Sequence, residues 1–427
     1  MKTITTHPGS QLHGNIHLPG DKSISHRAVM LGAIADGATH VTNFLPSGDC
    51  LATVGCMRGL GITIEMHSST SLSIHGSSLQ APVAPLDCVK SGTTMRLLTG
   101  ILASQPFDST LTGDEQLLRR PMRRIVEPLR RMDADITDTD GNAPLYVHGR
   151  PLQGYQHQLT VASAQVKSAL LLAGLQAAGT VTVVQPGPAR DHTERLLLAM
   201  GADIKVEGMT ITLRPPAKLS SLSIDVPGDI SSAAFPLVAA ALTTNSQITA
   251  RDVGLNPTRT GLLDVLQDMG LSIRLDNLRE IAGEPVGDVT VQPSALHGTT
   301  ISGNMIVRMI DEFPILTVAA TQAQGLTIVH DAAELRVKET DRIATVTAEL
   351  QKLGAQIAAT DDGFTVEGPT RLHGGSVDSH GDHRLAMALV VAGIVAEEKV
   401  TVQNTGCIPD SFPGFIELMK QIGARCD

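Results

Sequence analysis

Met57-Arg58-Gly59-Leu60-Gly61-Ile62-Thr63-Ile64 ends an apolar helical run, turns at a glycine and begins a strand, and similar phrases recur along the chain. Successive copies lie about seventy residues apart, which is too long for a solenoid repeat. Such a period predicts a supersecondary unit with two helices and several strands. The turn positions are Gly61, Asp133, Gly201, Gly270, Gly354 and Gly423.

Each repeat contains an apolar run and a stretch rich in Thr and Val. Helices that are apolar nearly all round are buried, and β-branched residues favour strands. The predicted buried helices are Ala28–Ala35, Met95–Ala103, Ala169–Ala178, Ala233–Leu242, Ile315–Thr321 and Leu385–Ala396. The predicted strands are Thr39–Asn43, Ser109–Thr112, Thr180–Val184, Gln247–Ala250, Leu326–His330 and Lys399–Gln403.

The composition indicates a globular protein of more than one domain. The chain has 427 residues, of which 42% are hydrophobic and 18% charged, and a chain of this length exceeds one ordinary domain. Aromatic residues make up only 2%, with no Trp, and the net charge is −10. Stacking platforms need aromatic side chains, and phosphate backbones attract cations. We therefore expect no nucleic-acid partner.

The cysteines and the apolar runs indicate a cytoplasmic protein. The five cysteines form no CxxC pair and no metal-ligand spacing with His, so we expect reduced thiols and no metal. Residues 1–18 contain no apolar region of the signal-peptide kind. The longest apolar runs fall well short of the roughly 20 residues of a membrane span. We expect neither a signal peptide nor a membrane partner.

Basic residues gather where the predicted helices begin. Ser, Thr and Asp at these points are ordinary N-caps, but a cation opposes the positive end of the helix dipole. Helix N-termini are also natural anion sites. We therefore interpret the clustered cations as ligands for an anionic substrate. They are Arg27, Arg96, Arg120, Arg190, Arg342 and Arg384.

The motifs that contain these cations resemble those of the 5-enolpyruvylshikimate-3-phosphate synthases. The longest is Leu18-Pro19-Gly20-Asp21-Lys22-Ser23-Ile24-Ser25-His26-Arg27-Ala28, and they occur in the family's order over nearly the whole chain. The longer matches are highly specific, whereas Asp-His-Arg alone would be weak. The others are Ser91–Leu97, Arg120-Pro121-Met122, Ser163–Ala169, Arg336–Arg342 and Asp382-His383-Arg384.

The resemblance implies an α/β fold of two similar domains that close on the substrate. Each domain would hold three βαβαββ-type units, the inside-out α/β barrel of enolpyruvyl transferases, which agrees with six repeats. By the motifs, one domain is 21–228, and the other is 1–20 with 229–427, with hinges near 20 and 228. The family transfers the enolpyruvyl group of phosphoenolpyruvate to shikimate 3-phosphate and releases phosphate, in the pathway to chorismate and aromatic amino acids.

The resemblance also implies which residues bind the two substrates. We expect no cofactor, small-molecule substrates only, and a monomer. The implied ligands of shikimate 3-phosphate are Lys22, Ser23, Arg27, Ser163, Ala164, Gln165, Arg190, Asp311 and Lys338. The implied ligands of phosphoenolpyruvate are Lys22, Gly92, Arg120, Gln165, Arg342 and Arg384.

The implied catalytic residues are Asp311, Lys22, Glu339 and His383. Asp311 would be the base near the 5-hydroxyl, Lys22 or Glu339 would protonate the enol, and His383 would lie by the phosphate. Simpler interpretations remain.

Asp311 and Asp229 are alternatively helix caps, and Glu339 is alternatively an ion-pair partner of Arg336 or Arg342. We expect His26 and His192 to be capping or surface residues.

Two positions depart from the family pattern. Val89-Lys90 stands where the family commonly has Gly-Asn, and Asp410 stands where some members have Lys. These changes put in doubt the loop shape and the tightness of the phosphoenolpyruvate subsite.

Two alternative functions remain open. One is the sister enzyme acting on UDP-N-acetylglucosamine, which usually carries a Cys that is lacking between Phe107 and Arg124. The other is a non-catalytic anion-binding relative.

Overall fold

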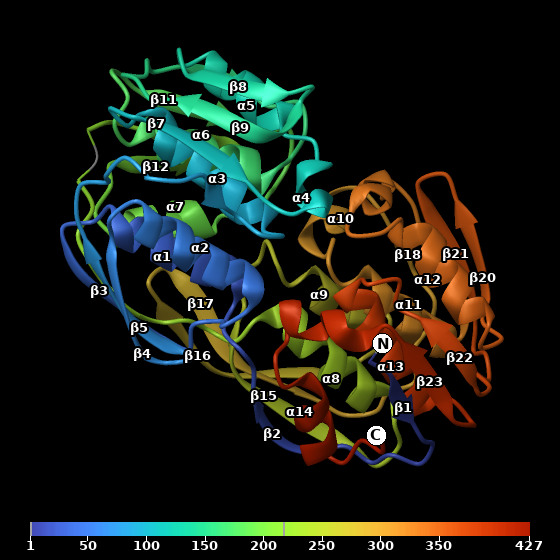
Figure 1. The fold of residues 1–427 in the computed structure, drawn as a ribbon. Helices are drawn as coiled ribbons and strands as arrows, with labels where there is room; N and C mark the ends of the chain where they lie inside the picture. The colour runs from blue at the N-terminus through green and yellow to red at the C-terminus, as the bar shows by residue number, and fades with distance from the viewer. Residues whose placement is uncertain (1, 217) are drawn as a thin grey trace. The chain divides into compact units, whose positions relative to one another are not determined.

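The computed structural model describes residues 2–216 and 218–427, and the chain divides into two compact units. The amino-terminal unit comprises Gly20–Val226 with the short segment Glu280–Glu284. The carboxy-terminal unit comprises the residues before Gly20, Pro227–Arg279 and Pro285–Asp427. Figure 1 follows the chain through both units by colour.

The segment Glu280–Glu284 differs from the domain boundaries expected from the motifs, which assigned it to the 229–427 domain. It is the turn between strands β16 (Ile273–Ile281) and β17 (Glu284–Val291). Ile281 and Ala282 pack against the core of the amino-terminal unit. The Arg195 guanidinium donates a 2.6 Å hydrogen bond to the Gly283 carbonyl. The sequence of the turn gave no sign of these contacts.

The sheets of the amino-terminal unit share one topology. Their orders are β14-β3-β5-β4, β6-β7-β9-β8 and β10-β11-β13-β12. In each, the first pair of strands is parallel and the next two pairs are antiparallel. The strands are β3 (Gly37–Thr42), β4 (Thr63–Ser68), β5 (Ser71–Gly76), β6 (Leu86–Asp87), β7 (Asp108–Thr112), β8 (Asp135–Thr139), β9 (Asn142–His148), β10 (Gln156–Gln158), β11 (Val181–Val184), β12 (Ile204–Glu207), β13 (Thr210–Leu213) and β14 (Ser223–Asp225).

The carboxy-terminal unit repeats this topology with one change at the chain ends. Its sheets have the orders β16-β17-β15-β2, β18-β19-β21-β20 and β1-β23-β22. In the last sheet, β1 pairs with β23 antiparallel and β22 pairs with β23 parallel. Besides β16 and β17, the strands are β1 (Ile4–Thr6), β2 (His13–His17), β15 (Gln247–Gly254), β18 (Thr300–Ile301), β19 (Gly325–Val329), β20 (Gln356–Thr360), β21 (Gly363–Gly368), β22 (Gly375–Asp378) and β23 (Val400–Gln403).

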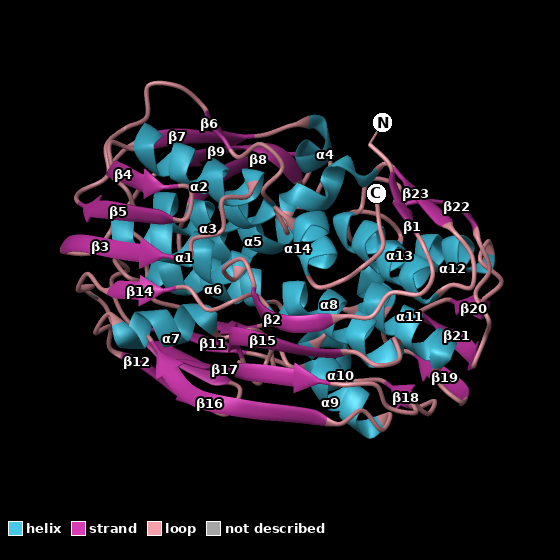
Figure 2. Cartoon of the chain, turned by 90° about the horizontal axis from the view of Figure 1, so that it is seen from below, coloured by secondary structure: helices cyan, strands magenta, loops and turns pink. Residues whose placement is uncertain are grey.

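Two sheets take their parallel strand from a distant part of the chain. β14, at the end of the third repeat, pairs with β3 of the first. β2, near the amino terminus, pairs with β15. Figure 2 shows β14 beside β3 and β2 beside β15.

The helices fall into two kinds. The first helix of each repeat is buried over almost its whole length, and most of its residues beyond the first turns are apolar. These helices are α1 (Lys22–Ala33), α3 (Gly92–Ala103), α6 (Ala164–Gly174), α8 (Ile230–Leu242), α11 (Phe313–Gln322) and α13 (His383–Val395). The other helices bury one face, and they are α2 (Gly48–Gly59), α4 (Glu115–Leu118), α5 (Arg123–Arg130), α7 (His192–Ala199), α9 (Gly261–Asp268), α10 (Asn304–Arg308), α12 (Arg342–Gln351) and α14 (Phe415–Gln421). Two 3₁₀ segments among the described residues are η1 (Ala333–Val337) and η2 (Thr405–Asp410).

The recurring phrase is a helix C-terminal cap. All six turn positions have positive φ, from +68° at Asp133 to +108° at Gly423, and glycine adopts this conformation without penalty. At the first copy, Gly61 N donates to Arg58 O and Ile62 N to Met57 O. This pattern satisfies the last carbonyls of the helix, and the chain then enters the next strand.

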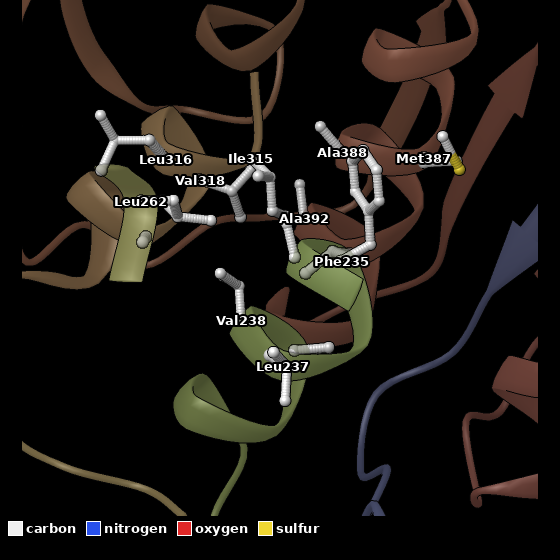
Figure 3. Packing of buried hydrophobic residues seen from close by; sticks show 14 of the residues in the cluster. Phe235, Leu237, Val238, Leu262, Ile315, Leu316, Val318, Met387, Ala388 and Ala392 are labelled. Atoms are coloured by element: carbon white, nitrogen blue, oxygen red, sulfur yellow. The ribbon is translucent and has the colours of Figure 1, made fainter. Parts of the chain in front are cut away.

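The core of the carboxy-terminal unit lies where its buried helices meet. Figure 3 shows Phe235 and Val238 of α8 beside Ile315 and Val318 of α11, with Ala392 of α13 between them. All of these side chains are almost fully buried. Among the described residues, no helix is long and apolar enough to cross a membrane.

Candidate active site

The first turn of α1 presents Lys22 and Ser23. Asp21 caps the helix, since its Oδ1 accepts a 2.9 Å hydrogen bond from Ile24 N. The Lys22 ammonium lies 2.5 Å from Asp49 Oδ2 on α2, and about a fifth of each side chain is exposed. Lys22 is therefore held at the start of α1 by a carboxylate of the neighbouring helix α2.

Arg27 is buried one turn further along α1, with 4% of its surface exposed. Its Nε donates to Thr193 Oγ1 at 2.7 Å, and its Nη2 donates to Ser168 Oγ at 2.8 Å. Its Nη1 donates to the Ser23 carbonyl at 2.9 Å. Burial lowers the pKa of Arg27 to about 10, so the guanidinium stays charged at neutral pH. These partners are neutral oxygens, which leave the positive charge of Arg27 available to an anion.

Gly92, Arg96, Arg120 and Gln165 lie together where α3 begins. A Cβ atom built on Gly92 would lie 2.9 Å from Arg96 Nη1 and 3.0 Å from Arg120 Nη1. Arg96 Nη1 also donates to Gln165 Oε1 at 2.8 Å. The glycine thus lets two guanidinium groups approach the helix start. Arg96 is absent from the predicted ligands, although it belongs to a quoted motif and to the cluster of cations.

The remaining predicted residues of this unit surround the start of α6. Ser163 is the N-cap of α6, and Ala164 is its first residue. Arg190 is half-buried just before α7 and close enough to Arg27 to influence its pKa. Sequence reasoning missed a buried ion pair behind them, because Lys167 Nζ lies 2.5 Å from Glu194 Oε1 and both are almost fully buried.

His26 and His192 are buried, so the prediction of capping or surface roles is wrong. His26 lies inside α1 with no exposed surface, and its Nδ1 is 2.6 Å from Thr53 Oγ1. His192 is 2% exposed, and its Nδ1 is 2.7 Å from Glu284 Oε1. Both lie beside charged residues in the sequence. The partners that bury them come from distant parts of the chain.

In the carboxy-terminal unit, Arg342 is the centre of a carboxylate cluster. It is 2% exposed, and its Nε lies 2.8 Å from Asp382 Oδ2. Its Nη2 lies 2.7 Å from Glu339 Oε2, and its Nη1 lies 3.5 Å from Asp311 Oδ1. Burial acts to lower the pKa of Arg342, but the three carboxylates raise it overall. Of the two ion-pair partners considered for Glu339, the structure brings it to Arg342.

Arg384, His383 and Lys338 belong to the same cluster. Arg384 Nη2 lies 3.9 Å from Asp311 Oδ2, and Arg384 Nη1 lies 3.9 Å from Glu312 Oε1. His383 opens α13 directly after the N-cap Asp382. Burial lowers the pKa of Lys338, with Asp311 among the charges that oppose this effect. Sequence reasoning missed the roles of Asp382, which pairs with Arg342, and of Glu312, which lies beside Arg384.

The two candidate caps have different roles. Asp229 caps α8, since its Oδ1 accepts a hydrogen bond from Ser231 N at 2.9 Å. Asp311 precedes Glu312, the N-cap of α11, and α11 has no side-chain cap hydrogen bond. About a fifth of the Asp311 side chain is exposed. The carboxylate of Asp311 is therefore engaged with guanidinium groups rather than with the helix start.

Each unit thus presents cations at helix starts with partly exposed acid-base groups among them. Such sets suit substrates with phosphate and carboxylate groups, since guanidinium groups match them in geometry. Within residues 2–216 and 218–427, no group of three or more His, Cys, Asp or Glu side chains is arranged to hold a metal ion. The candidate chemistry is proton transfer beside bound anions.

Comparison with known proteins shows which family the chain belongs to. The family model for EPSP synthase (3-phosphoshikimate 1-carboxyvinyltransferase) matches residues 6–419. The chain belongs to the EPSP synthase family. As a member of that family it is a transferase, and the resemblance read from its motifs is confirmed.

Relatives of this EPSP synthase family member match it over almost the whole chain. The 3-phosphoshikimate 1-carboxyvinyltransferase of Bacillus cytotoxicus is 50% identical over 96% of this chain and 98% of its own. The Bacillus subtilis protein of that name is 49% identical over 97% and 98%.

Solved structures confirm the predicted fold class, the two-domain enolpyruvyl transferase fold. An EPSP synthase from Acinetobacter baumannii has a TM-score of 0.92 and 43% identity, covering 100% of this chain and 99% of its own. The enolpyruvyl transferase NikO from Streptomyces tendae, at 19% identity, shares the fold with a TM-score of 0.81 over 100% and 98%.

Proposed function

We propose that the chain transfers the enolpyruvyl group of phosphoenolpyruvate to the 5-hydroxyl of shikimate 3-phosphate and releases phosphate. The observation that carries this proposal is the near-complete relationship to proteins named 3-phosphoshikimate 1-carboxyvinyltransferase. The collected cations support it, because both substrates are phosphorylated carboxylates. The family membership favours this acceptor over UDP-N-acetylglucosamine and over a loss of catalysis.

Shikimate 3-phosphate needs cations for its phosphate and carboxylate. Arg27 supports this assignment because its guanidinium donates to three neutral oxygens and forms no direct ion pair with another described residue. Lys338 supports it through its partly exposed position beside Asp311. The proposed ligands are Lys22, Ser23, Arg27, Ser163, Ala164, Gln165, Arg190, Asp311 and Lys338.

Phosphoenolpyruvate needs close approach of backbone and guanidinium groups. The cradle at Gly92, with two guanidinium groups about 3 Å from its missing Cβ, supports this subsite. Arg96 joins the proposal as a residue that orients Gln165. The proposed ligands are Lys22, Gly92, Arg120, Gln165, Arg342 and Arg384.

The reaction is an addition followed by an elimination. The 5-hydroxyl oxygen bonds to C2 of the enol while C3 takes a proton, which gives a tetrahedral ketal phosphate. Loss of a proton from the new methyl group and expulsion of phosphate restore the double bond. Asp311 is the proposed base for the 5-hydroxyl, Lys22 or Glu339 the proposed acid at C3, and His383 the proposed neighbour of the phosphate.

Family members act on small molecules, and we propose a monomeric cytoplasmic protein without metal or organic cofactor. Size-exclusion chromatography with light scattering tests the monomer. A mass of twice the chain at micromolar concentration would contradict it.

The activity is tested by phosphate release from phosphoenolpyruvate with each acceptor in turn. We expect release only with shikimate 3-phosphate present, and unchanged release after treatment with chelators of different structure. Equal turnover with UDP-N-acetylglucosamine would favour the sister activity. Binding of both substrates without release of phosphate would favour the non-catalytic relative.

A further inference from the structure

A chain of buried hydrogen bonds crosses the amino-terminal unit from α1 through α2 to α3. His26 Nδ1 lies 2.6 Å from Thr53 Oγ1, and Thr53 Oγ1 lies 2.7 Å from Thr94 Oγ1. Thr94 Oγ1 lies 2.7 Å from Ser91 Oγ, which also accepts from Thr94 N at 3.1 Å. None of these residues has exposed surface. We call His26, Thr53, Thr94 and Ser91 the relay.

The direction of the relay follows from counting hydrogens, since each hydroxyl has one to donate. Thr94 donates to Ser91 Oγ, with the Asp49 carbonyl a more distant alternative at 3.4 Å. Thr94 must then accept from Thr53, and Thr53 must accept from the imidazole. The hydrogen of His26 is thereby assigned to Nδ1.

The other imidazole nitrogen supports this assignment. His26 Nε2 is buried and has no hydrogen-bond partner among the described residues, and an acceptor nitrogen there is consistent with the hydrogen on Nδ1. Burial lowers the pKa of His26 to about 3, aided by Lys22 and Arg27 and opposed by Asp49 and Asp21. The imidazole is therefore neutral at physiological pH. A buried polar atom without a hydrogen bond, such as His26 Nε2, costs stability. We infer that the hydrogen bond of His26 Nδ1 has a role that offsets this cost.

The two ends of the relay lie at the two proposed subsites of this unit. His26 precedes Arg27 in α1, whose first turn carries Lys22 and Ser23. Ser91 is the N-cap of α3 and precedes Gly92. On α2, Asp49 adds a parallel link, because it pairs with Lys22 and its carbonyl approaches Thr94 Oγ1.

We propose that His26, Thr53 and Thr94 are positioning residues that fix the starts of α1 and α3 against each other. The relay fixes the position of the proposed shikimate 3-phosphate ligands on α1 relative to the proposed phosphoenolpyruvate cradle at Gly92. A shift of a fraction of an ångström at such groups is costly in rate. This inference rests on the proposed function.

The kinetic test replaces Thr53 by Val, which keeps the shape and removes the hydroxyl, and by Ser, which restores it. We expect Thr53→Val to lower kcat/KM for phosphoenolpyruvate about tenfold, mostly through KM, as for loss of one buried orienting hydrogen bond. Thr53→Ser should recover most of it. Thr94→Val serves as a second variant and should match Thr53→Val.

The control for simple destabilisation is Ile211→Val, which trims a buried side chain of β13 outside the relay. It should lower Tm without changing either KM. If Thr53→Val lowers Tm as Ile211→Val does and leaves KM within about twofold of the parent, the positioning role is overturned.

A second readout does not depend on activity. Long-range ¹H–¹⁵N spectra of the imidazoles, assigned with His26→Asn, report which nitrogen carries the hydrogen. We expect His26 to be the neutral Nδ1–H tautomer from about pH 5 to about pH 9, and Thr53→Val to change its ¹⁵N shifts. A hydrogen on Nε2 of His26, or an imidazolium, would overturn the relay. This readout does not depend on turnover. A parent enzyme that released no phosphate would instead overturn the proposed function and leave the test of the relay intact.

Discussion

His192 Nδ1 and Glu284 Oε1 lie 2.7 Å apart, with 2% and 1% of the side chains exposed. The two residues are separated by 92 positions and join the first turn of α7 to the turn between β16 and β17. Arg195 strengthens the same contact, since it donates to the Gly283 carbonyl and pairs with Asp191 at 2.9 Å. Arg190, a proposed substrate ligand, lies just before this anchored helix.

Removal of Glu284 should therefore be costly. We expect Glu284→Ala to lower the free energy of unfolding by about 3–5 kcal/mol, because a buried polar partner is left uncompensated. Glu284→Gln retains a hydrogen-bonding group and should cost about 1–2 kcal/mol. Urea denaturation measures both, with the exposed Glu280→Gln as the matched control. A loss under about 0.5 kcal/mol for Glu284→Ala would contradict the anchoring role.

Asp311→Asn should abolish most turnover while leaving the fold intact. The substitution keeps the shape of the side chain and removes its basicity, and loss of a general base costs on the order of 10²–10⁴ in rate. Shikimate 3-phosphate binding, measured by calorimetry, should persist. The control is Asp264→Asn, which affects another Arg-paired carboxylate of the same unit and should leave turnover unchanged. If Asp311→Asn turns over within a few-fold of the parent, the base is to be sought at Glu339 or His383.

Gly92→Ala should weaken the use of phosphoenolpyruvate without unfolding the chain. The new methyl group would lie about 3 Å from the Arg96 and Arg120 guanidinium groups, which must then move. We expect kcat/KM for phosphoenolpyruvate to fall at least about tenfold and Tm to change little, since flexible side-chain ends give way. Gly55→Ala, on α2 with no atom within 4 Å of its added Cβ, should leave the kinetics unchanged. Unaltered kinetics for Gly92→Ala would argue against the cradle.

Val89→Gly should stabilise the protein. Val89 has φ +53°, a left-handed conformation that costs an L-residue about 1–2 kcal/mol, part of which glycine loses again to the entropy of the unfolded chain. The loop thus has at Val89 a backbone conformation that glycine adopts readily. We expect a net gain of about 0.5–1 kcal/mol by urea denaturation. The control is Val83→Gly, at an exposed position whose φ is not positive, and it should not raise the free energy of unfolding. A lower free energy of unfolding for Val89→Gly would contradict backbone strain at Val89.

Glu349 should contribute to stability at neutral pH and lose that contribution in acid. Burial acts to raise its pKa, but hydrogen bonds from Lys352, the Asp378 backbone N–H and His380 lower it below 4.5 overall. A lowered folded pKa gives stability that is present above the unfolded value and lost as the pH falls through the folded one. The stability gap between the parent and Glu349→Gln should therefore narrow below pH 4.5. Urea midpoints across this range measure it against exposed Glu367→Gln, and a gap that stays constant would refute it.

Local signals in the sequence predicted the elements well. The predicted helix Met95–Ala103 lies within α3, and the predicted strand Lys399–Gln403 contains β23. The recurring turn at Gly61 and its equivalents correctly predicted the helix ends. A residue of positive φ there lets nearby N–H groups bond to the last carbonyls of the helix. Hydrogen bonds between residues that are close in the chain depend on a few consecutive residues, so the sequence predicts them.

The sequence by itself determined the repeats, their buried helices and the cations at the helix starts, since each depends on residues within a turn or two. Tertiary structure alone decided that β14 completes the sheet of β3 and that β2 completes the sheet of β15, because strand pairing joins backbones far apart in sequence. It also decided that His26 and His192 are buried. A histidine beside charged neighbours is exposed or buried according to partners such as Thr53 and Glu284, which only the folded chain brings to it.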